Sequence, residues 1–191
     1  MRQQSIQRLL IGLSAIASFL TVPALQHAPA QANFIRTGSN LVKRLTQPEV
    51  QLNLTAHKKI VQIDKNGKEQ ITWQDLGRKA TVQPGDVLRY SLTGSNIGDA
   101  AARDLVLNQP IPAQMSYVLN SARSNAGLQQ SYSIDGGKRF SDRPMIQVKQ
   151  ADGSTLEKPA PAELYTHVRW EAQSDLLPAS NLIASYEVRV R

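Results

Sequence analysis

The sequence contains no cysteine among its 191 residues. This absence excludes disulfide bonds, thiol catalysis, cysteine-ligated metals and lipoprotein anchoring. A chain of this length does not need disulfides, because it can bury a hydrophobic core without them. Histidine is also scarce, and neither His57 nor His167 stands in the spacing of a metal site. The sequence therefore predicts neither a metal nor a cofactor.

The patterns of common catalytic sites are also missing. There is no His-Glu-x-x-His, no Gly-x-Ser-x-Gly and no phosphate-binding glycine loop. Paired carboxylates can act as acid and base from distant positions, but Asp99, Asp104, Asp135 and Asp142 all stand in turn-like contexts. We interpret them as structural. The sequence thus predicts no catalytic residue, and it identifies no ligand-binding residue.

The first 32 residues have the order of a secretory signal. Arg2 and Arg8 precede the uncharged apolar run 9–22, Pro23 ends that run, and Ala30-Gln31-Ala32 supplies a small-x-small cleavage site. The run is shorter than the roughly 20 apolar residues of a spanning helix. We therefore predict a signal peptide over 1–32, a mature start at Asn33 and no transmembrane segment after processing.

The net charge is positive, with 22 basic and 15 acidic residues. Residues 1–32 hold two of the basic residues and none of the acids, so the predicted mature chain carries 20 − 15 = +5. Such a charge favours anionic partners. Nucleic acid is not expected, because the chain is predicted to be exported and its basic residues are scattered. Four arginines are predicted to face outward: Arg89, Arg169, Arg189 and Arg191.

Residues 33–48 are predicted to form a polar leader or a short helix packed on the domain, and a period-two pattern begins at Glu49. Apolar and polar residues alternate in short stretches, which are 50–54, 61–63, 71–73, 88–92, 132–134, 146–148, 168–170 and 186–190. This alternation is typical of antiparallel strands with one buried face. Asn66-Gly67 predicts a hairpin between two of them. The fold class predicted for 49–191 is all-β, an Ig-like antiparallel β-sandwich with extra N-terminal strands before residue 80.

Three local features complete this prediction. Residues 100–107 have helix-forming composition but end against Pro110, so a short helix and a strand are both compatible with them. Residues 158–163 predict an extended proline-rich loop. Trp73 and Trp170 stand at alternating strand positions and are predicted to lie in the core.

An ordered series of motifs adds a resemblance. It consists of Val82-x-Pro84-Gly85-Asp86, Tyr90, Asn96-x-Gly98-Asp99-Ala100, Leu105-Val106-Leu107, Pro110-Ile111-Pro112 and Tyr117. Residues 80–191 resemble the Ig-like module of bacterial surface proteins called the conserved-repeat family, domain of unknown function number eleven. The resemblance implies a secreted or surface structural module and no activity. Gln109 and Ala179 depart from the family pattern, which usually has an acidic residue and often glycine at those positions, and the first departure argues against calcium binding.

A second local motif is Ser133-x-Asp135-x-Gly137-x-x-Phe140. It resembles the Asp-box of sialidase-like propellers, in which the aspartate ties a hairpin turn together. One copy does not make a propeller. We therefore predict a structural hairpin here, with a glycan contact as the alternative.

Together these features predict an exported, non-enzymatic structural or interaction module of the bacterial cell envelope. The alternative is a binding accessory that recognises an anionic envelope polymer or an envelope protein, and a cryptic hydrolase is the least favoured reading. The sequence leaves open the oligomeric state and the choice between periplasm and cell surface.

Overall fold

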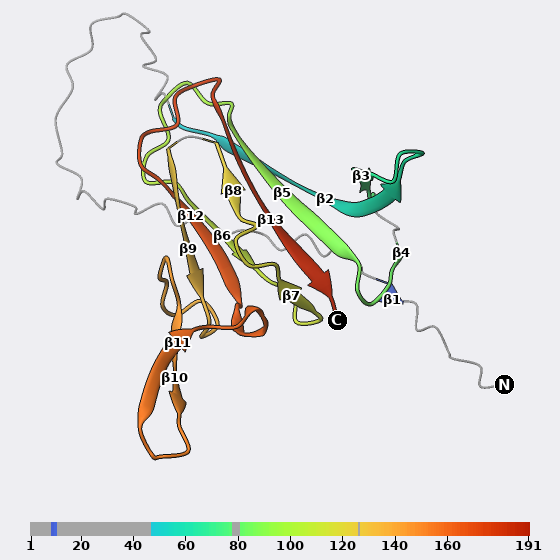
Figure 1. Cartoon of the computed structure of the whole chain (residues 1–191). Coiled ribbons are helices and arrows are strands. Elements are labelled where there is room, and N and C mark those ends of the chain that lie inside the picture. The colour runs from blue at the N-terminus through green and yellow to red at the C-terminus, as the bar shows by residue number, and fades with distance from the viewer. Residues whose placement is uncertain (1–8, 11–46, 78–80, 126) are drawn as a thin grey trace, which may run out of the picture.

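The computed structural model describes residues 9–10, 47–77, 81–125 and 127–191 (Figure 1). Except for Leu9–Leu10, the predicted signal peptide 1–32 lies outside the described residues, as does the leader up to residue 46. Leu9–Leu10 forms β1, which pairs with β4 (Thr81–Val82). Every other strand belongs to the part of the chain predicted to be a β domain.

Antiparallel strands form two main sheets. The larger sheet has the order β3-β2-β5-β13-β7, with β8 also paired to β13, and the smaller has the order β6-β12-β9. The strands of the larger sheet are β2 (Val50–Ile63), β3 (Glu69–Asp75), β5 (Val87–Asn96), β7 (Met115–Tyr117), β8 (Arg123–Ser124) and β13 (Asn181–Val190). Those of the smaller sheet are β6 (Val106–Pro110), β9 (Leu128–Ser133) and β12 (His167–Ala172).

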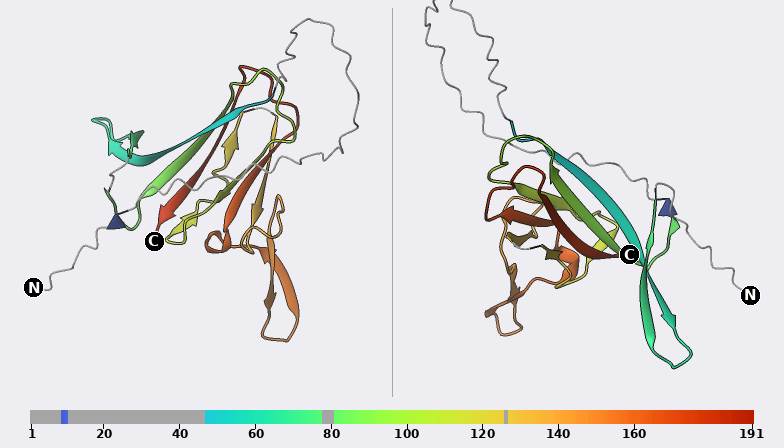
Figure 2. Two further views of the ribbon diagram at one scale, coloured as in Figure 1. Left: turned by 180° about the vertical axis from the view of Figure 1, so that it is seen from behind. Right: turned by 90° about the horizontal axis from the view of Figure 1, so that it is seen from above.

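Two hairpins extend from the body of the molecule (Figures 1 and 2). One consists of β10 (Met145–Lys149) and β11 (Thr155–Pro159), and the other is the far end of β2 with β3. The predicted turn at Asn66-Gly67 is confirmed: Gly67 has a φ of 76° and the Asp64 carboxylate accepts bonds from the backbone N–H groups of Asn66 and Lys68. A glycine reaches this conformation without steric cost.

The core lies between the two sheets, which confirms the predicted all-β sandwich. Alternate residues of β5, β12 and β13 point inward, and Trp170, Leu88, Val168 and Val188 are among the fully buried side chains. The indole of Trp170 lies 6.1 Å from the ring of Tyr186 on the opposite sheet, measured between centroids. Burial of such apolar surface contributes about 25 cal/mol per Å² to folding.

All five tyrosines take part in the interior. Tyr90 stacks on Tyr186 at 5.5 Å, and Tyr117 contacts both Tyr132 and Tyr165. Hydroxyl groups inside a core need partners; that of Tyr186 donates to the backbone carbonyl of Pro110. Burial raises the pKa of Tyr90, Tyr132, Tyr165 and Tyr186. These side chains therefore stay neutral. Their ring contacts join the two sheets.

Asn96 links three segments at one end of the sandwich. Its side chain is 1% exposed and its Nδ2 donates to the carbonyls of Ala100 and Leu176, both at 2.8 Å. Its Oδ1 accepts from the backbone N–H groups of Gly98 and Glu49. Gly98 fits only because it lacks a side chain, since a Cβ would lie 2.4 Å from the backbone where the chain enters β2.

Two local predictions are resolved by the structure. Residues 100–107 contain no helix; Ala102 forms a bridge with Leu176, and β6 begins at Val106. The predicted loop 158–163 was wrong in part, because Lys158 and Pro159 end β11 and the 3₁₀-helix η1 (Ala162–Leu164) follows. Strand pairing with β10 overrides the proline-rich composition there.

Candidate functional site

The Asp-box-like turn closes on itself as predicted. The Asp135 carboxylate accepts hydrogen bonds from the backbone N–H groups of Lys138 and Arg139 and from the Ser133 hydroxyl. It also pairs with the Arg139 guanidinium at 2.9 Å. These donors, those of Arg139 first, hold the pKa of Asp135 well below its usual range. Asp135 is thus a structural residue, as the sequence indicates.

The turn is fixed against the smaller sheet. The backbone N–H of Gly136 donates to the Thr166 hydroxyl, and Gly137 has a φ of 84°. A Cβ on Gly137 would lie 3.2 Å from the His167 ring. This close approach places the end of the turn, from Lys138 to Phe140, over the outer face of β12.

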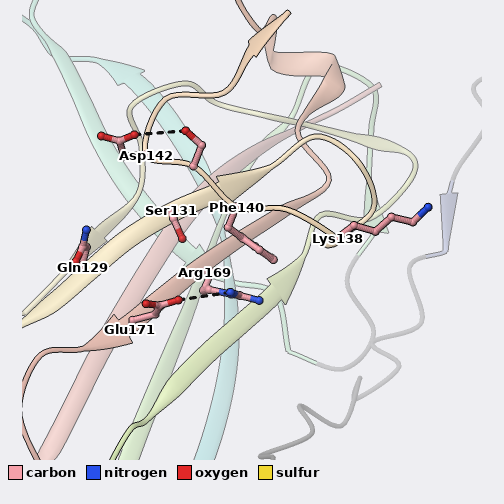
Figure 3. Close-up of a pocket in the computed structure, with 8 residues that line it drawn as sticks. Gln129, Ser131, Lys138, Phe140, Asp142, Arg169 and Glu171 are labelled. Carbon is pink, nitrogen blue, oxygen red and sulfur yellow. Dashed lines mark hydrogen bonds and ion pairs between the residues drawn. The ribbon is translucent and has the colours of Figure 1, made fainter.

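A hollow of about 380 Å³ lies where the turn meets that face (Figure 3). Its side chains come from β9, β12 and the loop after the turn. They are Gln129, Ser131, Lys138, Phe140, Ser141, Asp142, Arg169 and Glu171. The volume is in the range of small-molecule sites, which is about 300–1,000 Å³. The lining combines two cations, two carboxylates, one aromatic ring and several uncharged polar groups.

Arg169 lies at the centre of this hollow. Its guanidinium carbon is 3.5 Å from the centroid of the Phe140 ring, a cation–π contact. Its one hydrogen bond among the described residues runs from Nη1 to Glu171 at 3.4 Å, which is long. Its Nε is buried and has no hydrogen-bond partner there. The guanidinium is therefore held by stacking and keeps most of its donors unused.

A second unpaired atom lies on the neighbouring strand. Asn108 of β6 is the register partner of Arg169, so both side chains project from the same face of the sheet. Asn108 Oδ1 is buried and has no hydrogen-bond partner among the described residues. Unsatisfied buried polar groups each cost about 1–3 kcal/mol. An orphan acceptor and an orphan donor thus stand on paired positions of the sheet face that carries the hollow.

The other titratable side chains in and beside the hollow are Asp142, Glu171 and His167. Asp142 accepts a long bond from Ser141, at 3.4 Å, and Glu171 is the partner of Arg169. Burial, and then the charge of Arg169, lowers the pKa of His167, which is therefore neutral at pH 7. Among the residues with described positions, no three His, Asp or Glu side chains are grouped as a metal site requires.

The outward arginines do not form one patch. Arg89 lies on the outer face of the larger sheet and pairs with Glu187 at 2.7 Å. Arg189 and Arg191 are exposed and donate to Gly85, Ser116 and Glu163. Only Arg169 lies on the smaller sheet. Sequence alternation gives the face of each arginine but not the sheet on which it ends up.

The prediction that Trp73 lies in the core was wrong. Trp73 pairs with Lys59 on the outer face of the β2–β3 hairpin, and the Arg89 guanidinium lies 3.7 Å from the centroid of its ring. None of the described strands packs over that face, and Val61 and Ile71 on it are half exposed. An apolar strip continues beyond it along Val61, Ile63 and Ile71, with Ile63 exposed to 73%.

Other basic and acidic positions lie apart from the hollow. Lys58 pairs with Asp86 at 2.6 Å, and Asp99 and Asp104 lie in the loop between β5 and β6. The basic pair Lys43-Arg44 lies outside the described residues. None of the helices described is long and apolar enough to cross a membrane.

Comparison with protein families, curated proteins and solved structures returns no match to this chain. The resemblance to the conserved-repeat family, and with it the Ig-like assignment, stays a prediction. The class that the structure itself defines is an antiparallel β-sandwich with a polar, aromatic-edged hollow on its smaller sheet.

Proposed function

We propose that this protein is an exported, non-enzymatic binding module of the bacterial cell envelope that holds an anionic envelope polymer. The observation that carries the proposal is the hollow, in which Arg169 and Lys138 present cationic groups with no strong partner among the described residues. The predicted mature charge of +5 supports the same class of partner, because it raises the local concentration of anions.

The hollow also explains why binding is favoured over catalysis. Of its two carboxylates, Glu171 pairs with Arg169, whereas Asp142 lies beside the Ser141 hydroxyl (Figure 3). Glycoside hydrolysis needs one carboxyl group kept protonated and one ionised, in a site that excludes water. In this open hollow Glu171 accepts a hydrogen bond from Arg169 and Asp142 accepts one from Ser141, so neither carboxyl group is enclosed in a site of that kind.

Binding of the purified exported protein to polygalacturonate, measured by biolayer interferometry, tests the proposal. Binding should weaken steeply between 0.05 and 0.5 M salt, since screening shortens the Debye length from about 10 Å at 0.1 M to about 3 Å at 1 M. Lys138→Gln and Arg169→Gln should each reduce affinity. The matched control is Arg189→Gln on the other sheet, which should leave it unchanged.

Two outcomes would contradict this proposal. Equal losses of affinity in Arg189→Gln and Arg169→Gln would mean that diffuse surface charge, and not the hollow, attracts the polymer. Release of new reducing ends from polygalacturonate, lost in Asp142→Asn or Glu171→Gln, would make the protein a hydrolase. Export has its own measurement, because protein recovered outside the cytoplasm should begin at Asn33.

An envelope protein is the second candidate partner. The observation in its favour is the exposed apolar strip of the β2–β3 hairpin. It lies at the edge strand β3, whose outer backbone groups have no sheet partner among the described strands. An extended segment that adds a strand to β3 fits this edge. A photo-crosslinking residue at Ile71 should then capture one protein in whole cells, and a matched residue at Asn53 should not.

A further inference from the structure

We propose that the ligand of the hollow is a polysaccharide built from carboxylated sugars, with one sugar unit bound among the lining side chains so that its carboxylate meets Arg169. This inference rests on the proposed function and specifies the chemistry of its polymer. The groups that line the hollow are of mixed chemistry, both charged and uncharged.

A purely anionic ligand does not match that lining. Phosphate groups and simple polycarboxylates only accept hydrogen bonds, and Asp142 and Glu171 would repel them at short range. Sugar hydroxyls both donate and accept. They can donate to these two carboxylates and accept from Ser131 and Gln129, while a sugar carboxylate takes the cationic groups of Arg169 and Lys138.

The orphan atoms on the sheet face that carries the hollow point to the same kind of group. Arg169 Nε needs an acceptor and Asn108 Oδ1 needs a donor, and the two residues are register partners on one face. One hydroxyl oxygen satisfies both, because it accepts from Nε–H and donates its own proton to Oδ1. Both atoms are covered, so the Phe140 ring that stacks on Arg169 must shift for a ligand to reach them.

Phe140 supplies the one apolar wall. Sugar rings have apolar C–H faces, and an aromatic side chain beside convergent polar groups is a common composition for small-ligand sites. The hollow is open along the outer surface of the smaller sheet (Figure 3), so a polymer chain can pass through it without threading.

The experiment compares four probes on the full exported protein. These are polygalacturonate, its methyl ester, poly-L-glutamate and phosphatidylglycerol vesicles. Polygalacturonate should bind at least about tenfold more tightly than each of the others, because only it offers hydroxyls and carboxylates together. Equal binding of poly-L-glutamate or of the vesicles, still dependent on Arg169, would overturn the sugar assignment and leave the anionic-polymer function intact.

Other outcomes are equally decisive. Equal binding of the methyl ester would overturn the carboxylate assignment, and no binding by any probe would overturn both this inference and the proposed function. Arg169→Lys keeps the charge but removes the guanidinium Nε. It should therefore weaken the binding of polygalacturonate about tenfold and change the binding of poly-L-glutamate little. Asn108→Leu should also weaken the binding of polygalacturonate. Asn53→Leu on the other sheet is the matched control. Full binding by Asn108→Leu would exclude the proposed hydroxyl position.

Discussion

Replacing Asn96 by alanine should destabilise this protein more than any exposed asparagine does. The substitution removes four hydrogen bonds, two donated by Nδ2 and two accepted by Oδ1. Each such bond contributes about 0.5–1.5 kcal/mol net. The side chain is 1% exposed, so water does not replace the lost partners. We therefore expect a loss of about 3–5 kcal/mol, a large share of the roughly 5–15 kcal/mol stability of a typical domain.

Urea unfolding followed by tryptophan fluorescence measures this loss. The control is Asn125→Ala, because Asn125 makes two hydrogen bonds across the surface of the same sheet, where water can substitute; it should cost below about 1 kcal/mol. Asn96→Asp tests the donor and the acceptor of the side-chain amide separately. It keeps the acceptor but turns a charged oxygen toward the carbonyls of Ala100 and Leu176, so it should be at least as harmful at neutral pH.

Protonation of Asp at position 96 restores one donor, so acid should reduce the deficit of that variant relative to the wild type. A loss below about 1 kcal/mol for Asn96→Ala would refute the reasoning. It would mean that the loop segments around residue 96 are held by their backbone bonds alone.

Three further predictions concern the core, a strained turn and acid stability. Trp170→Ala should cost about 3–5 kcal/mol in chemical unfolding, whereas Trp170→Phe should cost far less, because it also removes an indole N–H that is buried without a partner among the described residues. Ala179→Gly should stabilise the fold by up to about 1 kcal/mol in the same assay, since Ala179 has a φ of 58°, where a Cβ is strained. The pKa of His167 is lowered by burial and by Arg169, so its contribution to stability is present above pH 6.5 and is lost as the pH falls through the lowered value; His167→Gln should flatten that part of the pH profile. A steeper profile in His167→Gln would mean that another group titrates there.

Local pattern was sufficient for many of the strands, such as β5, β12 and β13, and for the faces of their residues. Alternation along 88–92 and 186–190 predicts which side chains point inward, because successive strand residues face opposite sides. It does not predict whether a second layer covers a given face. Trp73 shows the difference, since its ring lies on the outer face of the larger sheet with Arg89 and points away from the smaller sheet.

The contacts between distant segments could not be predicted from the sequence. The turn bond from Asn96 to Gly98 follows from residue type, but the bonds to Glu49 and Leu176 depend on how distant segments meet. The hollow is even harder to predict from the sequence, because it forms only when the turn at Ser133–Phe140 folds over Arg169 on β12. The Asp-box-like motif is the one local sign of it, because this motif predicts a structural hairpin with a glycan contact as the alternative.

The direction of the strands has a mechanical consequence. β2 and β13 both pair antiparallel with β5, so they run the same way: Val50 lies beside Asn96 at one end of β5, and Arg189 lies beside Val87 at the other. The start of β2 and the end of β13 are therefore at opposite ends of the sheet (Figure 1). Tension applied between these two points acts along the strands and shears the ladders on both sides of β5. The hydrogen bonds of each ladder then share the force together instead of opening one after another.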